Sequence, residues 1–315
     1  MPVDVIEHQA SESVLSAAEQ TRSSWARLIR SRDEVPPAYR RFFAARPVGE
    51  PFPYAVLTPT FAGFMRRETE KLICGLDDRL LILEKTSGEP QCTAFPLSEI
   101  NYVEVGAVLL KAWLTMQGRA NDEAALTTIT LRFNTVTDRL FTPLVDRIRG
   151  TAANPIGFPR DLELDKLDSF DLPSYKFWNY ARQSVRPGDR VIAAIGQAEL
   201  RRPVVRLGRW TYQRTIATAH VLLLTDCELI VIHDDPDSPQ SSDKTRYGGV
   251  WDYIPLNKIE RIAWRDRDAA LLAVTLDLPL GDRIESLFPA ERRAEVEWFL
   301  KQLSEWAPEA TLQRA

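Results

Sequence analysis

The hydrophobic residues of this chain come mostly in short runs that are rich in leucine and β-branched residues. The clearest runs are residues 80–84 (LLILE) and 229–233 (LIVIH), and each follows a turn that contains aspartate. This arrangement is typical of a buried strand entered from a hairpin. Similar runs at 127–133 and 271–278 predict further strands. The pattern therefore predicts a mainly β protein.

A second spacing, of three and four residues, predicts helices that cap the strands. Near the end of the chain, Pro289 precedes an apolar stripe that ends at Trp306, and a shorter stripe ends before Gly150. Shorter helical segments are expected at 37–46 and 173–182, and an amphipathic helix at 11–34. The residues of the two stripes are Val296, Phe299, Leu303 and Trp306, and Phe141, Leu144, Val145 and Ile148.

Three blocks of sequence recur in the same order, which predicts an internal duplication. The paired blocks are 37–46 with 173–182, 72–84 with 221–233, and 95–103 with 254–262. The spacing between blocks changes only where loops can absorb insertions. We therefore expect five segments: an N-terminal amphipathic helix region (1–35), a first repeat with its leading helix (36–150), a linker (151–172), a second repeat with its leading helix (173–308) and a tail (309–315).

Each repeat resembles pleckstrin-homology-like (PH-like) domains, including GRAM and bacterial versions. The resemblance rests on the turn at Asp77 and Asp226, the Pro-Leu-x-x-Ile blocks at Pro96 and Pro255, and a closing helix. It implies two partly open antiparallel barrels in tandem, each plugged by its last helix, that bind phosphoinositide head groups, peptides or proteins and rarely perform chemistry. The expected first hairpin of the first repeat interleaves its basic residues with Glu68 and Glu70, so we do not expect head-group binding there.

Composition narrows the class of protein. The net charge of −4 over 315 residues argues against a surface built for nucleic acid. Three cysteines are too few to cross-link a chain of this length with disulfides, and this small number favours a location in the reducing cytosol. The N-terminus lacks the features of a secretory signal, and no apolar window is long enough to span a membrane. We expect a cytoplasmic protein, at most peripheral to the membrane. The excess of arginine over lysine is typical of GC-rich bacterial genomes.

Residues for catalysis or metal binding do not converge in the sequence. His8, His220 and His233 share no ligand spacing with cysteines or carboxylates, and no nucleophile-elbow, Walker or dinucleotide motif occurs. We interpret His233 as a structural histidine at a strand exit, and Cys227 as an unreactive turn residue. We therefore predict no catalytic residues, no metal and no cofactor.

The strongest local anomaly is the arginine-rich stretch 201–214 (RRPVVRLGRWTYQR), which contains no acidic residue. If it is an extended hairpin, alternation places Arg206, Trp210, Tyr212 and Arg214 on one face, where guanidinium groups beside aromatic rings can bind an anion or an acidic partner. The alternative is a solvated hairpin whose arginine stems cover apolar surface. The candidate site residues are Arg201, Arg202, Arg206, Arg209, Trp210, Tyr212 and Arg214.

The sequence thus predicts a non-enzymatic binding or scaffolding protein whose second repeat carries the ligand surface. The alternative function is a peripheral membrane protein that binds acidic lipid through the arginine-rich hairpin. The expected partner is a protein or an acidic lipid or anion, a nucleic acid is not expected, and homo-oligomerisation is left open. The N-terminal helix packs on its own domains or on a second subunit in one interpretation, and on a membrane in the other.

Overall fold

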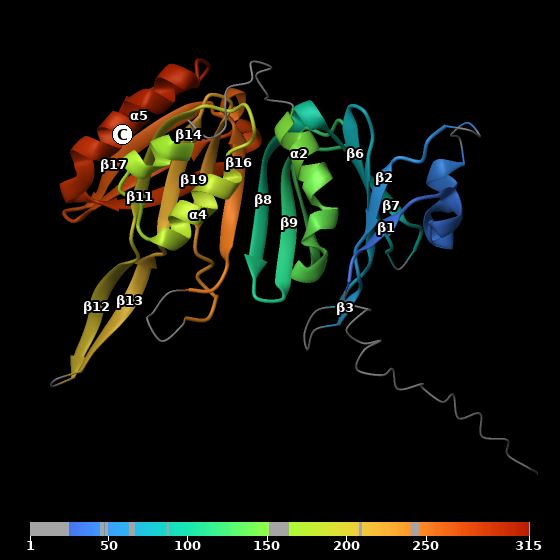
Figure 1. Ribbon diagram of the computed structural model, residues 1–315, viewed down its shortest axis with the longest axis horizontal. Helices are drawn as coiled ribbons and strands as arrows, with labels where there is room; N and C mark the ends of the chain where they lie inside the picture. Colours follow the sequence, from blue (N-terminus) through green and yellow to red (C-terminus); the bar gives the residue numbers. More distant parts are fainter. Residues whose placement is uncertain are drawn as a thin grey trace, which may run out of the picture.

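The structure is a computed structural model that describes residues 25–44, 47, 50–62, 67–86, 88–150, 164–207, 210–240 and 246–314. It is mainly β, with several antiparallel sheets and few short helices, as the sequence predicts. Below, residues 25–150 are called the first half and residues 164–314 the second half. Figure 1 shows the two halves side by side along the longest axis.

The first half contains a five-stranded antiparallel sheet and a three-stranded meander. The sheet has the order β1-β2-β5-β6-β7, and the short hairpin β3–β4 lies between β2 and β5 in the chain. The strands are β1 (Arg27–Ile29), β2 (Tyr54–Leu57), β3 (Phe61–Ala62), β4 (Arg67–Glu68), β5 (Lys71–Gly75), β6 (Arg79–Glu84), β7 (Gln91–Pro96), β8 (Ile100–Val108), β9 (Lys111–Arg119) and β10 (Leu126–Asn134). Helix α2 (Thr142–Gly150) follows the last strand, and the 3₁₀ helices are η1 (Arg32–Glu34), η2 (Pro37–Phe43), η3 (Leu97–Glu99) and η4 (Thr135–Leu140).

The second half has its elements in a similar order. Helix α4 (Tyr175–Ser184) comes first, and helix α5 (Arg293–Trp306) follows the last antiparallel strand. The strands are β11 (Val191–Gln197), β12 (Leu200–Leu207), β13 (Trp210–Ala217), β14 (His220–Thr225), β15 (Glu228–His233), β16 (Gly249–Pro255), β17 (Arg261–Asp268), β18 (Leu271–Asp277), β19 (Arg283–Pro289) and β20 (Thr311–Arg314). The 3₁₀ helices are η5 (Leu167–Ser169), η6 (Leu256–Lys258), η7 (Pro279–Gly281) and η8 (Ala290–Arg292). Strand β20 pairs in parallel with β17.

One sheet runs through both halves, which the sequence did not lead us to expect. Strand β8 of the first half pairs antiparallel with β16 of the second, from Val103 opposite Tyr253 to Ala107 opposite Gly249. The result is a seven-stranded sheet with the order β10-β9-β8-β16-β15-β14-β11. No sheet formed by the described residues closes into a barrel. The halves are therefore joined by backbone hydrogen bonds as well as by the chain.

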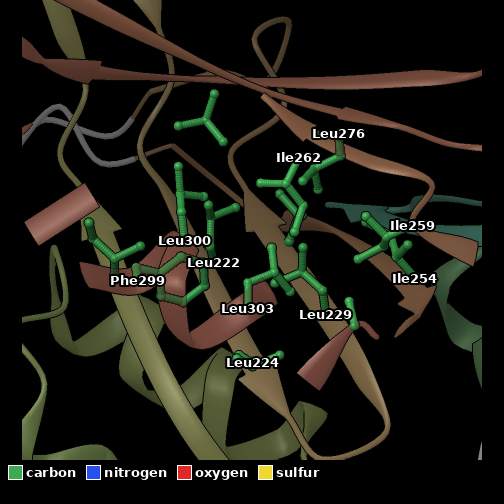
Figure 2. Packing of buried hydrophobic residues seen from close by; sticks show 14 of the residues in the cluster. Leu222, Leu224, Leu229, Ile254, Ile259, Ile262, Leu276, Phe299, Leu300 and Leu303 are labelled. Atoms are coloured by element: carbon green, nitrogen blue, oxygen red, sulfur yellow. The ribbon is translucent and has the colours of Figure 1, made fainter. Parts of the chain in front are cut away.

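Each half has its own core, closed by its last helix. In the second half Phe299 and Leu303 of α5 are buried against the strands, as the predicted stripe requires, while Trp306 is partly buried. Figure 2 shows Phe299, Leu300 and Leu303 pointing toward Leu222, Leu229 and Ile262. In the first half all four residues of the predicted stripe are buried in one cluster with β8, β9 and β10.

A helix near the start of each half packs against the strands that follow it. Tyr39 of η2 is buried against β2 and β5, and Phe177 of α4 is buried against β14 and β15. Tyr175, the first residue of α4, is 74% exposed. The buried positions of α4 are Phe177, Ala181 and Ser184, which are spaced by four and three residues and so form one helical face.

The predicted N-terminal helix is not found in residues 25–34, the part of the segment that the structure describes. Residues 11–24 lie outside the described residues, and Arg27–Ile29 forms β1, which pairs with Ala55 to Leu57 of β2. Ile29 is buried, so this segment contributes an edge strand to the core. The pairing supplies hydrogen-bond partners to the outer edge of β2, which outweighs the helical spacing of the segment.

Candidate functional site

The arginine-rich stretch forms a hairpin that projects from the second half. Strands β12 and β13 make a separate two-stranded sheet that extends away from the body of the molecule (Figure 1). The register is irregular between Pro203 and Val205. Proline has no backbone N–H to donate to the ladder, so an irregularity is expected beside it. Beyond it, Arg206 is paired with Thr211, so the regular alternation from which we predicted a common face does not run through the hairpin.

Two of the candidate arginines already have acidic partners, contrary to the expectation drawn from the acid-free stretch. Nη2 of Arg201 lies 2.5 Å from Oε2 of Glu199, just before the stretch. Nη2 of Arg202 lies 2.7 Å from Oδ2 of Asp268, at the end of β17. A paired guanidinium has less to gain from a further anion. These two residues therefore anchor the hairpin to its base.

The remaining described site residues lie in β13. Tyr212 is 69% exposed and Arg214 is exposed. Arg214 stands directly opposite Arg202 in the ladder, and within the described ranges it forms no ion pair. The side chains of Arg206 and Trp210, and the whole of Arg209, lie outside the described residues. Of the predicted set, Tyr212 and Arg214 are thus the residues placed to meet a partner.

A pocket that the sequence did not indicate lies at the base of this hairpin. Its volume is about 550 Å³. Its walls come from β13 to β16, from β19 and from the connection between β15 and β16. His220, His233, Asp252 and Arg246 contribute the polar wall, and Ala217, Val231, Ile284 and Leu287 are among the apolar residues. We call this the hairpin-base pocket.

The sheet register brings the polar wall together. His220 of β14 stands directly opposite His233 of β15, and Asp252 of β16 stands opposite Val231, two residues before His233. Directly paired residues, and residues two apart, share a face of a sheet. Glu104 of β8 is the next residue on this face, because it is paired with Asp252. The seam between the halves thus places a first-half carboxylate beside a second-half carboxylate.

His220 is a neutral, buried acceptor. It is 5% exposed, and burial lowers its pKa to about 4. Its Nδ1 lies 3.1 Å from the carbonyl oxygen of Thr218. Because a carbonyl only accepts, Nδ1 carries the proton and Nε2 is the acceptor of the neutral ring. Among the described residues Nε2 has no hydrogen-bond partner.

His233 and Glu104 both interact with Asp252. Burial disfavours protonation of His233, yet the hydrogen bond and charge of Asp252 raise its pKa overall, with Nε2 at 3.5 Å from Oδ2 of Asp252. Burial and the nearby Asp252 raise the pKa of Glu104, which accepts a hydrogen bond from Nε1 of Trp113 at 2.5 Å. Oδ1 of Asp252 has no hydrogen-bond partner in the described part of the chain.

The arginines at the rim of the hairpin-base pocket are already paired. Arg246 contacts Glu199 at 3.1 Å and donates to the carbonyl oxygens of Pro236 and Ser238, although its Nε has no partner among the described groups. Arg267 contacts Glu285 at 3.4 Å, and Arg283 contacts Asp277 at 2.7 Å. Glu199 and Asp277 are each shared with a second arginine, Arg201 and Arg261 respectively.

Sequence reasoning treated His220 and His233 as unrelated, and one signal could have joined them. They lie at equal distances from the centre of the Asp226–Cys227 turn, so a regular hairpin places them opposite each other. The pairing of Asp252 with Glu104 carried no such local signal, because it depends on the contact between β8 and β16. His233 is the last residue of β15, the strand exit at which we expected it, and it is partly buried.

One group of side chains elsewhere has the proximity of metal ligands. Asp189, Asp226 and Cys227 bring ligand atoms within 4.8 Å of one another. Both carboxylates are already neutralised, Asp189 by Arg186 at 2.9 Å and Asp226 by Arg190 at 3.2 Å. The thiol of Cys227 donates a hydrogen bond to Oδ1 of Asp226, with 3.7 Å between sulfur and oxygen. Ion pairing explains this cluster, and we assign no metal to it.

No protein-family model matches the chain, and no curated protein matches it significantly. None of the helices in the described ranges combines the length and the apolar character that crossing a membrane requires.

Proposed function

We propose that this chain is a non-enzymatic binding protein built from two PH-like halves that arose by duplication, and that the second half carries the ligand surface. The order of elements supports the duplication. In each half a strand, a hairpin and three further strands precede a 3₁₀ turn, a meander and a helix. Pro96 and Pro255 both end a strand and precede that 3₁₀ turn. Asp77 and Asp226 both lie in the turn between two paired strands.

The observation that carries the binding role is the projecting hairpin β12–β13. A hairpin that stands away from the core contributes little to folding, yet it presents Tyr212 and Arg214 to solvent. Exposed tyrosine and arginine are the residue types most enriched at binding hot spots. Arg214 is exposed and forms no ion pair within the described ranges, so its charge favours an acidic partner. A cytoplasmic location and the absence of catalysis remain predictions.

Binding of poly-glutamate to the immobilised full chain tests this function. Wild type should retain the peptide at low salt and release it as salt rises, because exposed charges are screened. Arg214→Glu should abolish retention, and Tyr212→Ala should weaken it. The matched control is Arg265→Glu, an exposed arginine of β17 in the same half, which should bind like wild type.

Vesicles provide the second arm. If the partner is an acidic protein, this chain should not co-sediment with vesicles of phosphatidylcholine and phosphatidylserine. Sedimentation that requires Arg214, without retention of poly-glutamate, would instead support the alternative function of binding acidic lipid at a membrane surface. A wild-type protein that binds neither probe at low salt would contradict the proposed role of the hairpin.

A further inference from the structure

We propose that the outer edge of β17 pairs with strand β7 of a second copy of this chain, and that β20 is a displaceable cover over that edge. Each copy offers one edge of each kind, so the copies join head to tail. This surface rests on the duplication proposed above, whereas the arginine-rich hairpin plays no part in it. It therefore gives the chain an interaction that goes beyond the proposed binding role.

The seam between β8 and β16 is the template for this contact. Strand β16 pairs with β15 on one edge and with β8 on the other, and it ends at Pro255. Strand β7 ends at Pro96 and corresponds to β16 in the recurring blocks, and β17 corresponds to β8 in the same way. Figure 1 shows β17 and β7 toward opposite ends of the molecule, so both edges are available to different neighbours.

Strand β20 covers the edge of β17 that corresponds to the seam. It pairs in parallel with β17 from Arg261 opposite Thr311 to Trp264 opposite Arg314. By the spacing of the recurring blocks, Ile262, Ala263 and Trp264 correspond to residues 103–105 of β8, which are the positions that pair with β16. The cover thus lies on the part of β17 that a neighbouring strand would use.

The attachment of β20 is weak enough to be displaced. All four of its residues are exposed, and parallel pairing is slightly less stable per residue than antiparallel pairing. Its side-chain contacts are those of Arg314, which lies over the ring of Trp264 at 4.7 Å and 4.0 Å from Oδ2 of Asp266. Exposed contacts of these kinds contribute about 1 kcal/mol or less each. An antiparallel strand with the same number of pairs can therefore compete with β20.

The outer edge of β7 is covered at a single position in the described part of the chain. The backbone N–H of Ala94 donates to Oδ1 of Asn121 at 2.8 Å, and the N–H of Asn121 donates to the carbonyl oxygen of Ala94 at 2.9 Å. These bonds show that Ala94 directs its backbone groups away from β6. Cys92, two residues earlier, directs its own groups to the same side. Asn121 thus satisfies one ladder position and leaves the next one to a partner.

The side chains that would face each other are compatible. In the register of the seam, where Asp252 stands opposite Glu104, Thr93 of one copy would stand opposite Ala263 of the next. The flanking pairs would be Cys92 with Trp264 and Ala94 with Ile262. No like charges meet in these pairs, in contrast to the two carboxylates of the seam. The contact between copies therefore avoids a repulsion that the contact within the chain accepts.

Removal of the cover from the full chain tests the interaction. The N–H of Thr311 donates to the carbonyl oxygen of Glu260 at 3.1 Å, so Thr311→Pro removes a bond that holds β20. Leu312→Pro is the matched control, because alternate residues of a strand direct their N–H groups to opposite sides. In sedimentation equilibrium up to about 0.3 mM, the average mass of Thr311→Pro should rise with concentration to at least twice the chain mass. Wild type and Leu312→Pro should stay near the mass of one chain.

Two further substitutions, made in the Thr311→Pro chain, identify the edge that pairs. Cys92→Pro removes the outward N–H of β7 and should return the protein to the mass of one chain. Cys92→Ala keeps this N–H and should leave the assembly intact. Arg214→Glu should also leave it intact, so a failure of the hairpin to bind acidic partners and a failure of this contact are told apart. A chain that ends at Ala310 lacks β20 altogether and keeps the test open if Thr311→Pro retains the strand.

Three results would overturn the interaction. One is that both Thr311→Pro and the chain ending at Ala310 keep the mass of one chain throughout the concentration range. Another is an assembly that persists with Cys92→Pro, since it would then use a different surface. The third is a wild type that assembles as strongly as Thr311→Pro, which would show that β20 does not cover the edge.

Discussion

His220 and His233 stand directly opposite each other on β14 and β15, yet their pKa values are shifted in opposite directions. The difference follows from the other groups that each ring contacts. His220 donates to a backbone carbonyl and faces Phe288 at 5.0 Å between ring centroids, whereas His233 faces the carboxylate of Asp252. Burial thus dominates at one position and a charged partner dominates at the other.

This pair predicts how stability depends on pH. Because the folded-state pKa of His220 is about 4, below its unfolded value, its contribution to stability is present above pH 6.5 and is lost as pH falls toward 4. The loss should amount to about 3 kcal/mol in the free energy of unfolding. Urea unfolding of wild type and of His220→Gln at a series of pH values measures this loss. The difference between their free energies of unfolding should shrink as the pH falls toward 4.

His233 should behave in the opposite sense and serves as the internal control. Its pKa is raised in the folded state, so its contribution is fully present below the unfolded pKa and is lost as pH rises through the folded value. The difference between wild type and His233→Gln should therefore shrink on going to alkaline pH. Parallel pH profiles for the two variants would contradict this assignment.

Arg149 and Glu228 should make a large, non-additive contribution to stability. Nη2 of Arg149 donates to Oε1 of Glu228 at 2.6 Å and to the carbonyl oxygen of Ser184 at 2.6 Å. Among the described cations, Arg149→Met leaves the buried Glu228 carboxylate with Arg186 at 3.8 Å, and it should cost about 3–5 kcal/mol in chemical unfolding. The double variant Arg149→Met, Glu228→Leu should recover much of that loss. A cost below about 1 kcal/mol for the single variant would show that the pair is not buried as described.

Gly248 should be sensitive to substitution because the two halves meet there. Its φ is +73°, and a Cβ at this position would lie 2.0 Å from the carbonyl oxygen of Ala107 in β8. Gly281 has a similar φ of +77° but has nothing within 4 Å of the same atom. Gly281→Ala therefore measures backbone strain alone, about 1 kcal/mol. Gly248→Ala should lower the free energy of unfolding by several times this amount, and equal costs would argue against close contact at the seam.

Helix α5 provides a direct test of the second core. Phe299 is 1% exposed and Trp298, its neighbour, is 49% exposed. Phe299→Ala should cost about 3–5 kcal/mol through lost burial and the cavity left behind. Trp298→Ala should change the free energy of unfolding by no more than about 0.5 kcal/mol, as is usual for surface positions. Thermal or urea unfolding of both variants distinguishes them.

The sequence predicted the features that local periodicity controls. Phe299 and Leu303 are spaced as one helical face and are buried as one face, because a helix fixes which residues lie together. The same argument fails for Arg27, where pairing with β2 outweighs the helical spacing of the segment. The partner of Arg202 could not be predicted either, because Asp268 lies at the end of a distant strand.

The candidate site shows the same limit more sharply. The sequence indicated the projecting hairpin through its arginines, but not the pocket beneath it, whose lining residues come from several strands that lie far apart in the sequence. Pairing between strand edges is made by backbone groups that every residue carries, so side-chain patterns say little about which edges meet. A resemblance to single domains also cannot predict a contact between two of them.

The shared ladder between β8 and β16 makes the chain a candidate for fragment complementation. If residues 1–150 and 164–315 are produced as separate chains, each leaves one long strand edge without its backbone partner, and Glu104 and Asp252 are parted. Each fragment alone should therefore be prone to aggregation, and mixing the two should restore solubility by edge-to-edge pairing. We therefore expect the chain to tolerate a cut between the two halves and to reassemble through the pairing of β8 with β16.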